Sequence, residues 1–105
     1  MTHEWARNEI GRVADAMLSG ATSFIEGARK LSGLRFSANL EQDPDLVPFV
    51  AIDSETDELP IGEVRKLWSA DALERFQPKI ARAEEWARQV GYSHCEQLAK
   101  RFGGL

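Results

Sequence analysis

The chain has 105 residues, a formal net charge of −4 at pH 7 and a hydrophobic content of 43%. This length and composition suit one globular domain with a single modest core, over residues 1–105. The acidic balance argues against general binding to nucleic acid, which needs a basic surface, and no apolar run approaches the ~18 residues of a membrane span.

The N-terminal sequence and the cysteine content point to the same cellular compartment. The N-terminus is polar and lacks the apolar stretch of a signal peptide. The single cysteine, Cys95, rules out a disulfide within the chain, which fits a reducing environment. We therefore predict a cytoplasmic protein that does not bind membranes.

The first predicted element is an amphipathic helix over residues 2–19. Its apolar residues recur at spacings of three and four, which places them on one helix face. They are Ala6, Ile10, Val13 and Met17. Thr2 is the expected N-cap and Gly20 the expected C-cap of this helix.

A second helix is predicted over residues 21–31, with Thr22 or Ser23 as its N-cap. Gly27 lies on its apolar face. A glycine there weakens the helix but permits a close approach to another helix, and we expect such an approach. The chain is expected to leave the helix near Gly33.

A third helix is predicted from Pro44 to about Ser54. Asp43 followed by proline is typical of a helix start, with the aspartate as N-cap. Pro48 is awkward in this helix because it lacks a backbone donor. The alternative is a buried strand over residues 47–53, since the run F-V-A-I is rich in strand formers. We favour the helix.

The last predicted element is a long helix that follows a turn over residues 55–62. Ser69 is its expected N-cap, Pro78 is expected to kink or restart it, and Gly103-Gly104 is expected to end it. We therefore predict an all-α fold, a small helical bundle of four to five helices whose last helix is long and kinked near the proline. A homodimer is compatible with the apolar stripes on the first and last helices.

Eight carboxylates and no base lie between Arg35 and Arg65. Crowded like charges cost stability, so this run draws attention as a functional surface. We predict that its second half docks a basic protein, and that a tryptophan beside it acts as an exposed anchor. The alternative for this tryptophan is packing in the core. The predicted partner-binding residues are Asp53, Glu55, Asp57, Glu58 and Trp68.

The same run has a purely structural interpretation. In this alternative, Arg65 forms an ion pair with a carboxylate of the run, namely Asp53, Glu55 or Asp57, and the motif fixes the turn between two helices. A solvated acidic loop that keeps the protein soluble is the plainest form of this alternative.

The segment V-A-I-D-S-E-T-D resembles the first motif of the DEDD 3′–5′ exonucleases, a hydrophobic strand followed by D-x-E-T. The resemblance implies a metal-dependent hydrolase in which Asp53 and Glu55 bind metal ions and Thr56 supplies a neighbouring hydroxyl. It covers this segment alone. The further acidic motifs of that family, one with a histidine before an aspartate, have no counterpart in the chain.

Two other metal or nucleophile patterns fail on spacing. A calcium loop that starts at Asp53 would have Glu58 where it needs glycine and Val64 where it needs glutamate, which excludes a standard EF-hand. His94 and Cys95 are adjacent on a helix and point about 100° apart, so they do not form a catalytic pair. We predict no cofactor, no resident metal and no enzyme activity.

The run D-P-D-x-x-x-F-V-x-I-D-S-E-T-D-x-L-P-x-G-x-V-R-x-x-W, followed by S-A-D-A-L, resembles a family of small uncharacterised bacterial proteins. The likeness spans roughly residues 17–102 and is most specific from Asp53 to Trp68. It implies a small cytoplasmic bacterial protein and carries over no site residue. Together these observations predict an acidic protein-binding domain, most concretely an immunity or antitoxin protein that neutralises a basic toxin domain.

Overall fold

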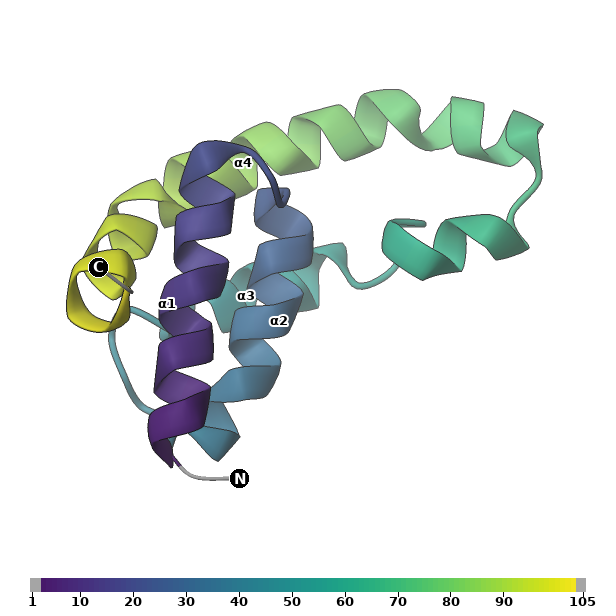
Figure 1. Cartoon of the computed structure of the whole chain (residues 1–105). Helices are drawn as coiled ribbons and strands as arrows, with labels where there is room; N and C mark the ends of the chain where they lie inside the picture. The colour runs from purple at the N-terminus through teal and green to yellow at the C-terminus, as the bar shows by residue number, and fades with distance from the viewer. Residues whose placement is uncertain (1–2, 104–105) are drawn as a thin grey trace.

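The computed structural model describes residues 3–103, without the side chains of Glu63 and Val64. Within this range the chain forms four α-helices, one short 3₁₀-helix and no strand, which confirms the all-α prediction (Figure 1). The elements are α1 (His3–Ser19), α2 (Phe24–Ser37), α3 (Val47–Thr56), η1 (Gly62–Leu67) and α4 (Ala70–Phe102). None of these helices has the length and apolarity to cross a membrane.

Two of the predicted N-caps are confirmed. The Ser23 hydroxyl accepts a hydrogen bond from the Glu26 N–H at 3.1 Å, and the Ser69 hydroxyl accepts one from the Ala72 N–H at 3.2 Å. Each serine satisfies one of the backbone donors that a helix start leaves unpaired. The predicted end of the last helix is also confirmed, because Gly103 is its C-cap and donates its N–H to the Ala99 carbonyl at 2.7 Å. Thr2 and Gly104 lie outside the described residues.

The predicted end of α2 is wrong. The helix does not stop near Gly33 but continues to Ser37, and the Ala38 N–H closes it on the Leu34 carbonyl at 3.0 Å. Gly33 is exposed, and a side chain there would meet no other atom. Its glycine therefore marks a tolerated surface position and not a helix end.

Residues 47–56 are helical, so the helix that we favoured over a strand is confirmed, but its predicted start is wrong. The helix begins at Val47 with Leu46 as N-cap, and Pro48 falls in its first turn, where no backbone donor is needed. The Asp43 carboxylate instead accepts a hydrogen bond from the Asp45 N–H at 2.9 Å. This aspartate therefore orders the turn that precedes the helix.

The last helix, α4, runs from Ala70 to Phe102 with Pro78 inside it, so the proline does not restart the helix and the α-helix count is four. Pro78 is exposed, and water can therefore bond the carbonyl that its missing N–H leaves unpaired. The kink expected at this proline stays a prediction.

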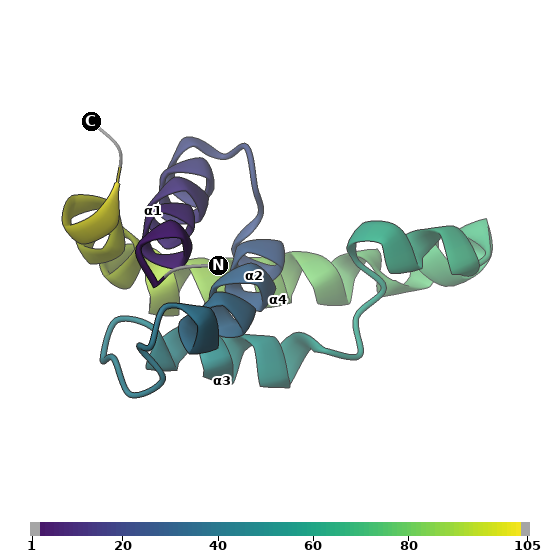
Figure 2. The same cartoon turned by 60° about the horizontal axis from the view of Figure 1, so that its bottom comes forward.

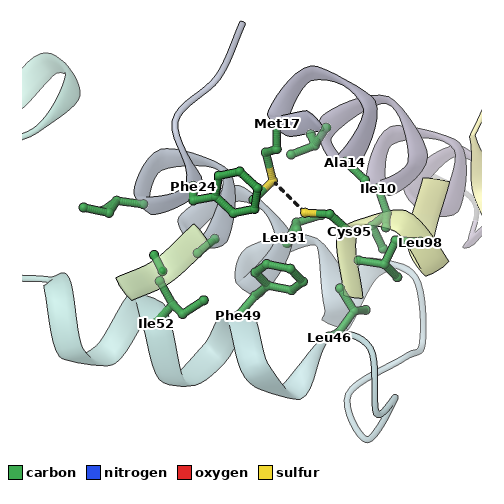
Figure 3. Close-up of a cluster of buried hydrophobic side chains, with 14 of the residues drawn as sticks. Ile10, Ala14, Met17, Phe24, Leu31, Leu46, Phe49, Ile52, Cys95 and Leu98 are labelled. Atoms are coloured by element: carbon green, nitrogen blue, oxygen red, sulfur yellow. Dashed lines mark hydrogen bonds between the residues drawn. The ribbon is translucent and has the colours of Figure 1, made fainter. Parts of the chain in front are cut away.

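The core lies where α1, α2, α3 and the C-terminal half of α4 meet (Figure 3). Its largest fully buried side chains include Phe24, Phe49 and Ile10. Two glycines let helices come close: a Cβ at Gly11 would collide with the carbonyl of Phe102, and one at Gly27 would collide with the thioether of Met17. The close approach predicted at the second glycine is confirmed.

A second part of the molecule projects from this body as an arm, formed by η1 and the first half of α4 (Figures 1 and 2). Trp68 and Phe76 hold the arm together through an edge-to-face contact with ring centroids 5.1 Å apart. The linking turn is anchored by Leu59, Pro60 and Ile61, which are all buried. The arm therefore leaves the middle of α4 accessible beside α3.

Candidate functional site

Three exposed carboxylates gather at the C-terminal end of α3, and we call them the acidic end: Glu55, Asp57 and Glu58. The last turn of this helix contains no basic residue. Because the C-terminus of a helix carries a partial negative charge, carboxylates placed there add to an already negative potential. Part of the acidic run thus forms an exposed surface that attracts cations.

Asp53, another predicted docking residue, differs from these three carboxylates because Arg29 of α2 contacts it. The arginine Nε lies 3.9 Å from the aspartate Oδ1, and its Nη2 donates a 2.6 Å hydrogen bond to the Thr56 carbonyl. Arg29 therefore offsets the negative end of α3 from inside the fold. Asp53 is half-buried and contributes to this contact.

The geometry of α3 gives no support to a metal site at Asp53 and Glu55. The resemblance to the exonucleases requires a strand before D-x-E-T, whereas this segment is helical, and residues two apart on a helix point about 200° apart. The Thr56 hydroxyl is also committed, since it donates to the Ile52 carbonyl at 2.7 Å. Among the side chains that the structure describes, no group of three His, Cys, Asp or Glu residues could hold a metal ion.

The other two predicted site residues lie on the arm or beside it. Trp68 is half-buried against Phe76, so it packs within the arm. Arg65 is exposed on η1 and lines a hollow with Glu26 and Glu84. In the part of the chain that the structure describes, no ion pair joins Arg65 to the predicted carboxylates, and this pairing stays a prediction.

The structure places a groove of about 380 Å³ between α3 and α4, next to the acidic end. Glu55 and Thr56 form one wall, and the other wall comes from four residues of α4: Lys79, Arg82, Ala83 and Trp86. Trp86 is 40% exposed. We predicted Trp68 as the anchor and not Trp86, although Lys79, Arg82 and Trp86 recur at the spacing of one helix face.

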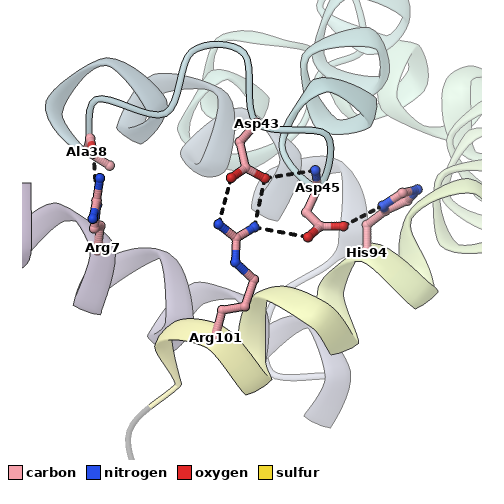
Figure 4. A network of polar contacts seen from close by, with 6 residues as sticks. All are labelled: Arg7, Ala38, Asp43, Asp45, His94 and Arg101. Atoms are coloured by element: carbon pink, nitrogen blue, oxygen red, sulfur yellow. Dashed lines mark hydrogen bonds and ion pairs between the residues drawn. The ribbon is translucent and has the colours of Figure 1, made fainter.

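The most extensive polar network involves a different pair of carboxylates, Asp43 and Asp45 (Figure 4). Arg101 forms two hydrogen bonds to Asp43, at 2.8 and 2.7 Å, and a third to Asp45 at 3.0 Å. The Asp45 carboxylate also lies 3.1 Å from His94 Nδ1. These contacts tie the loop before α3 to the last turns of α4.

The electrostatic consequence is clearest at Asp43, whose side chain is only 8% exposed. The hydrogen bonds from Arg101 lower the pKa of Asp43 below its ordinary value, because they favour the charged carboxylate. The same contact raises the pKa of Arg101. This network was not foreseen, since its partners are 58 residues apart in sequence.

Glu84 is another carboxylate with a structural task. Its two oxygens accept hydrogen bonds from the first two N–H groups of α2, from Phe24 at 2.7 Å and from Ile25 at 3.1 Å. A side chain of α4 therefore caps α2 across the fold, in addition to the local cap from Ser23.

His94 and Cys95 do not act together, as predicted. His94 is a half-buried boundary residue that faces Asp45. Cys95 is fully buried with its sulfur 3.7 Å from the Met17 sulfur, and burial raises the pKa of this thiol to about 12. A thiol so protonated is a poor nucleophile at neutral pH.

Comparison with known proteins adds no further constraint. No protein-family model matches the chain, and neither the curated proteins nor the solved structures show a significant match.

Proposed function

We propose that this domain binds a protein with a basic surface through the acidic end of α3. The proposal rests on one difference among the carboxylates: some contact cationic side chains within the fold, whereas others are exposed. Asp53, Asp43 and Asp45 contact cationic side chains within the fold. The acidic end has three exposed carboxylates at a helix terminus without a basic residue in its last turn.

Charge left at such a place costs stability, because the carboxylates repel one another and the helix dipole. A basic partner removes that repulsion on binding, and its approach is accelerated by the negative potential. Binding of this kind weakens as salt rises, since both surfaces are exposed to solvent.

The most concrete form of the proposal is an immunity or antitoxin protein in the cytoplasm of a bacterium. Such a protein must capture a basic toxin domain quickly, and a small acidic helical domain suits electrostatically steered capture. The resemblance of residues 43–73 to small bacterial proteins is in keeping with this proposal.

The test is capture of a partner from native lysate by the tagged protein and by two charge-matched variants. Asp57→Lys with Glu58→Lys reverses two charges of the acidic end. Glu74→Lys with Glu96→Lys reverses two exposed charges on α4. Both variants move the net charge from −4 to 0, so a difference between them reports position and not total charge.

We expect the unaltered protein and the α4 variant to retain one stoichiometric basic partner that salt releases. The variant of the acidic end should lose it. Equal capture by both variants would refute the acidic end as the docking surface, as would a partner that 1 M salt does not release.

The rival proposal is the metal-dependent hydrolase with Asp53 and Glu55 as ligands. Binding of a divalent ion to the folded state would raise the melting temperature by mass action. Because α3 points these two side chains apart, we expect millimolar Mg²⁺ or Mn²⁺ to leave the melting temperature unchanged. A rise that is lost in Asp53→Asn would reinstate the metal site.

A further inference from the structure

The groove between α3 and α4 has walls of opposite charge that do not touch. Glu55 lines one side, and Lys79 and Arg82 line the other. Within the described residues, no ion pair of 4 Å or less joins Glu55 to either base. Each wall therefore presents its charge to whatever occupies the groove.

The groove also contains an exposed aromatic surface. Trp86 is 40% exposed and lines it, and Val90, one turn further along α4, is 37% exposed. Aromatic side chains of this kind, flanked by charges, are typical of the centre of a protein interface.

We propose that this groove is the interface of a homodimer, and that its occupant is the same groove of a second copy of this chain. A two-fold axis that runs along the groove exchanges its two walls. The acidic wall of each copy then faces the basic wall of the other. Two equivalent contacts form, each between Glu55 of one copy and Lys79 and Arg82 of the other copy.

The same operation explains the position of the tryptophan. A rotation about an axis along the groove leaves each residue at the same height, so Trp86, which belongs to the basic wall, packs against the acidic wall of the second copy and becomes covered. An axis perpendicular to the groove would instead place acid against acid and base against base. The charge pattern therefore favours the dimer whose two-fold axis runs along the groove.

The dimer and the acidic end share Glu55, but the two proposals can be tested separately. Asp57 and Glu58 do not line the groove, so the proposed dimer contacts use Glu55 and not these two residues. Their reversal tests partner capture, whereas the dimer is tested on the purified protein alone. Failure of one proposal therefore leaves the other unaffected.

The experiment is sedimentation equilibrium of the full chain from 5 to 500 μM at 0.15 M salt. The unaltered protein should form a dimer. Glu55→Arg should weaken it about tenfold or more, and so should Arg82→Glu, because each places like charges together at two symmetry-related positions. The double variant Glu55→Arg with Arg82→Glu restores opposite charges across the axis and should recover most of the affinity.

The aromatic contact has a matched control. Trp86→Ala should also shift the equilibrium towards monomer, whereas Trp5→Ala, which alters a similarly exposed tryptophan on α1, should not. A protein that is monomeric at 500 μM overturns the proposal. So does a dimer that persists unchanged in the single-charge variants, or a double variant that recovers nothing.

Discussion

Two groups of carboxylates from the same acidic stretch differ in their contacts within the fold. Asp43 and Asp45 are drawn against α4, where Arg101 and His94 contact them. Glu55, Asp57 and Glu58, only ten or so residues later, stay exposed at the end of α3. The difference teaches that a run of acids in a sequence is not one surface, because tertiary contacts decide which charges are neutralised.

The largest effect expected from breaking this contrast is at Asp43. Replacing it by Ala removes two charge-assisted hydrogen bonds from Arg101 and the turn contact with the Asp45 N–H. We expect a loss of about 2–3 kcal/mol in the free energy of unfolding. Urea denaturation measures it.

The matched control is Asp57→Ala, which removes an exposed carboxylate at the end of α3. This substitution should change the free energy of unfolding by less than about 0.5 kcal/mol, or stabilise the fold slightly by relieving repulsion. Similar losses at the two aspartates would show that the two groups are not distinct.

A smaller loss of stability is expected at Glu84. This carboxylate of α4 also has contacts within the fold, so it extends the comparison to another helix. Glu84→Ala leaves the first two N–H groups of α2 without this acceptor. We expect a loss of about 1–2 kcal/mol. Its neighbour Glu85 is exposed, so Glu85→Ala is the control and should be close to neutral; thermal unfolding of both variants decides.

Lowering the pH is expected to have the smallest of the three effects on stability. Because Arg101 lowers the pKa of Asp43 in the folded state, the unfolded chain binds the proton more readily. The stabilisation is therefore complete above the ordinary value of 3.8 and is lost as pH falls through the lowered value. Asp43→Asn should have a shallower loss of stability below pH 4 in urea melts; an identical slope would contradict the assignment.

The helices themselves were largely predictable from the sequence, for a local reason. Each apolar stripe recurs every three or four residues, and Ser23 and Ser69 mark helix starts by chemistry that acts within one turn. At Asp43 the local signal was misleading because a tertiary contact uses the side chain. Asp43 has the signature of an N-cap, yet its carboxylate serves Arg101 and a turn.

The candidate site was predictable only in part. The acidic end follows from the charge run, because α3 ends within it. The opposite wall of the groove comes from α4, and the cation that holds Asp53 comes from α2. No local pattern joins residues that lie 24 or more positions apart, so neither Trp86 nor Arg29 was assigned a place beside this run.

The most direct test of the division between engaged and exposed carboxylates is chemical labelling with a water-soluble carbodiimide and glycine ethyl ester, read residue by residue by mass spectrometry. The free protein should label rapidly at Asp57 and Glu58 and slowly at Asp43. In the complex isolated from lysate, Asp57 and Glu58 should become protected while Asp43 stays unchanged. Equal labelling of all three in the free protein, or unprotected Asp57 and Glu58 in the complex, would contradict the account.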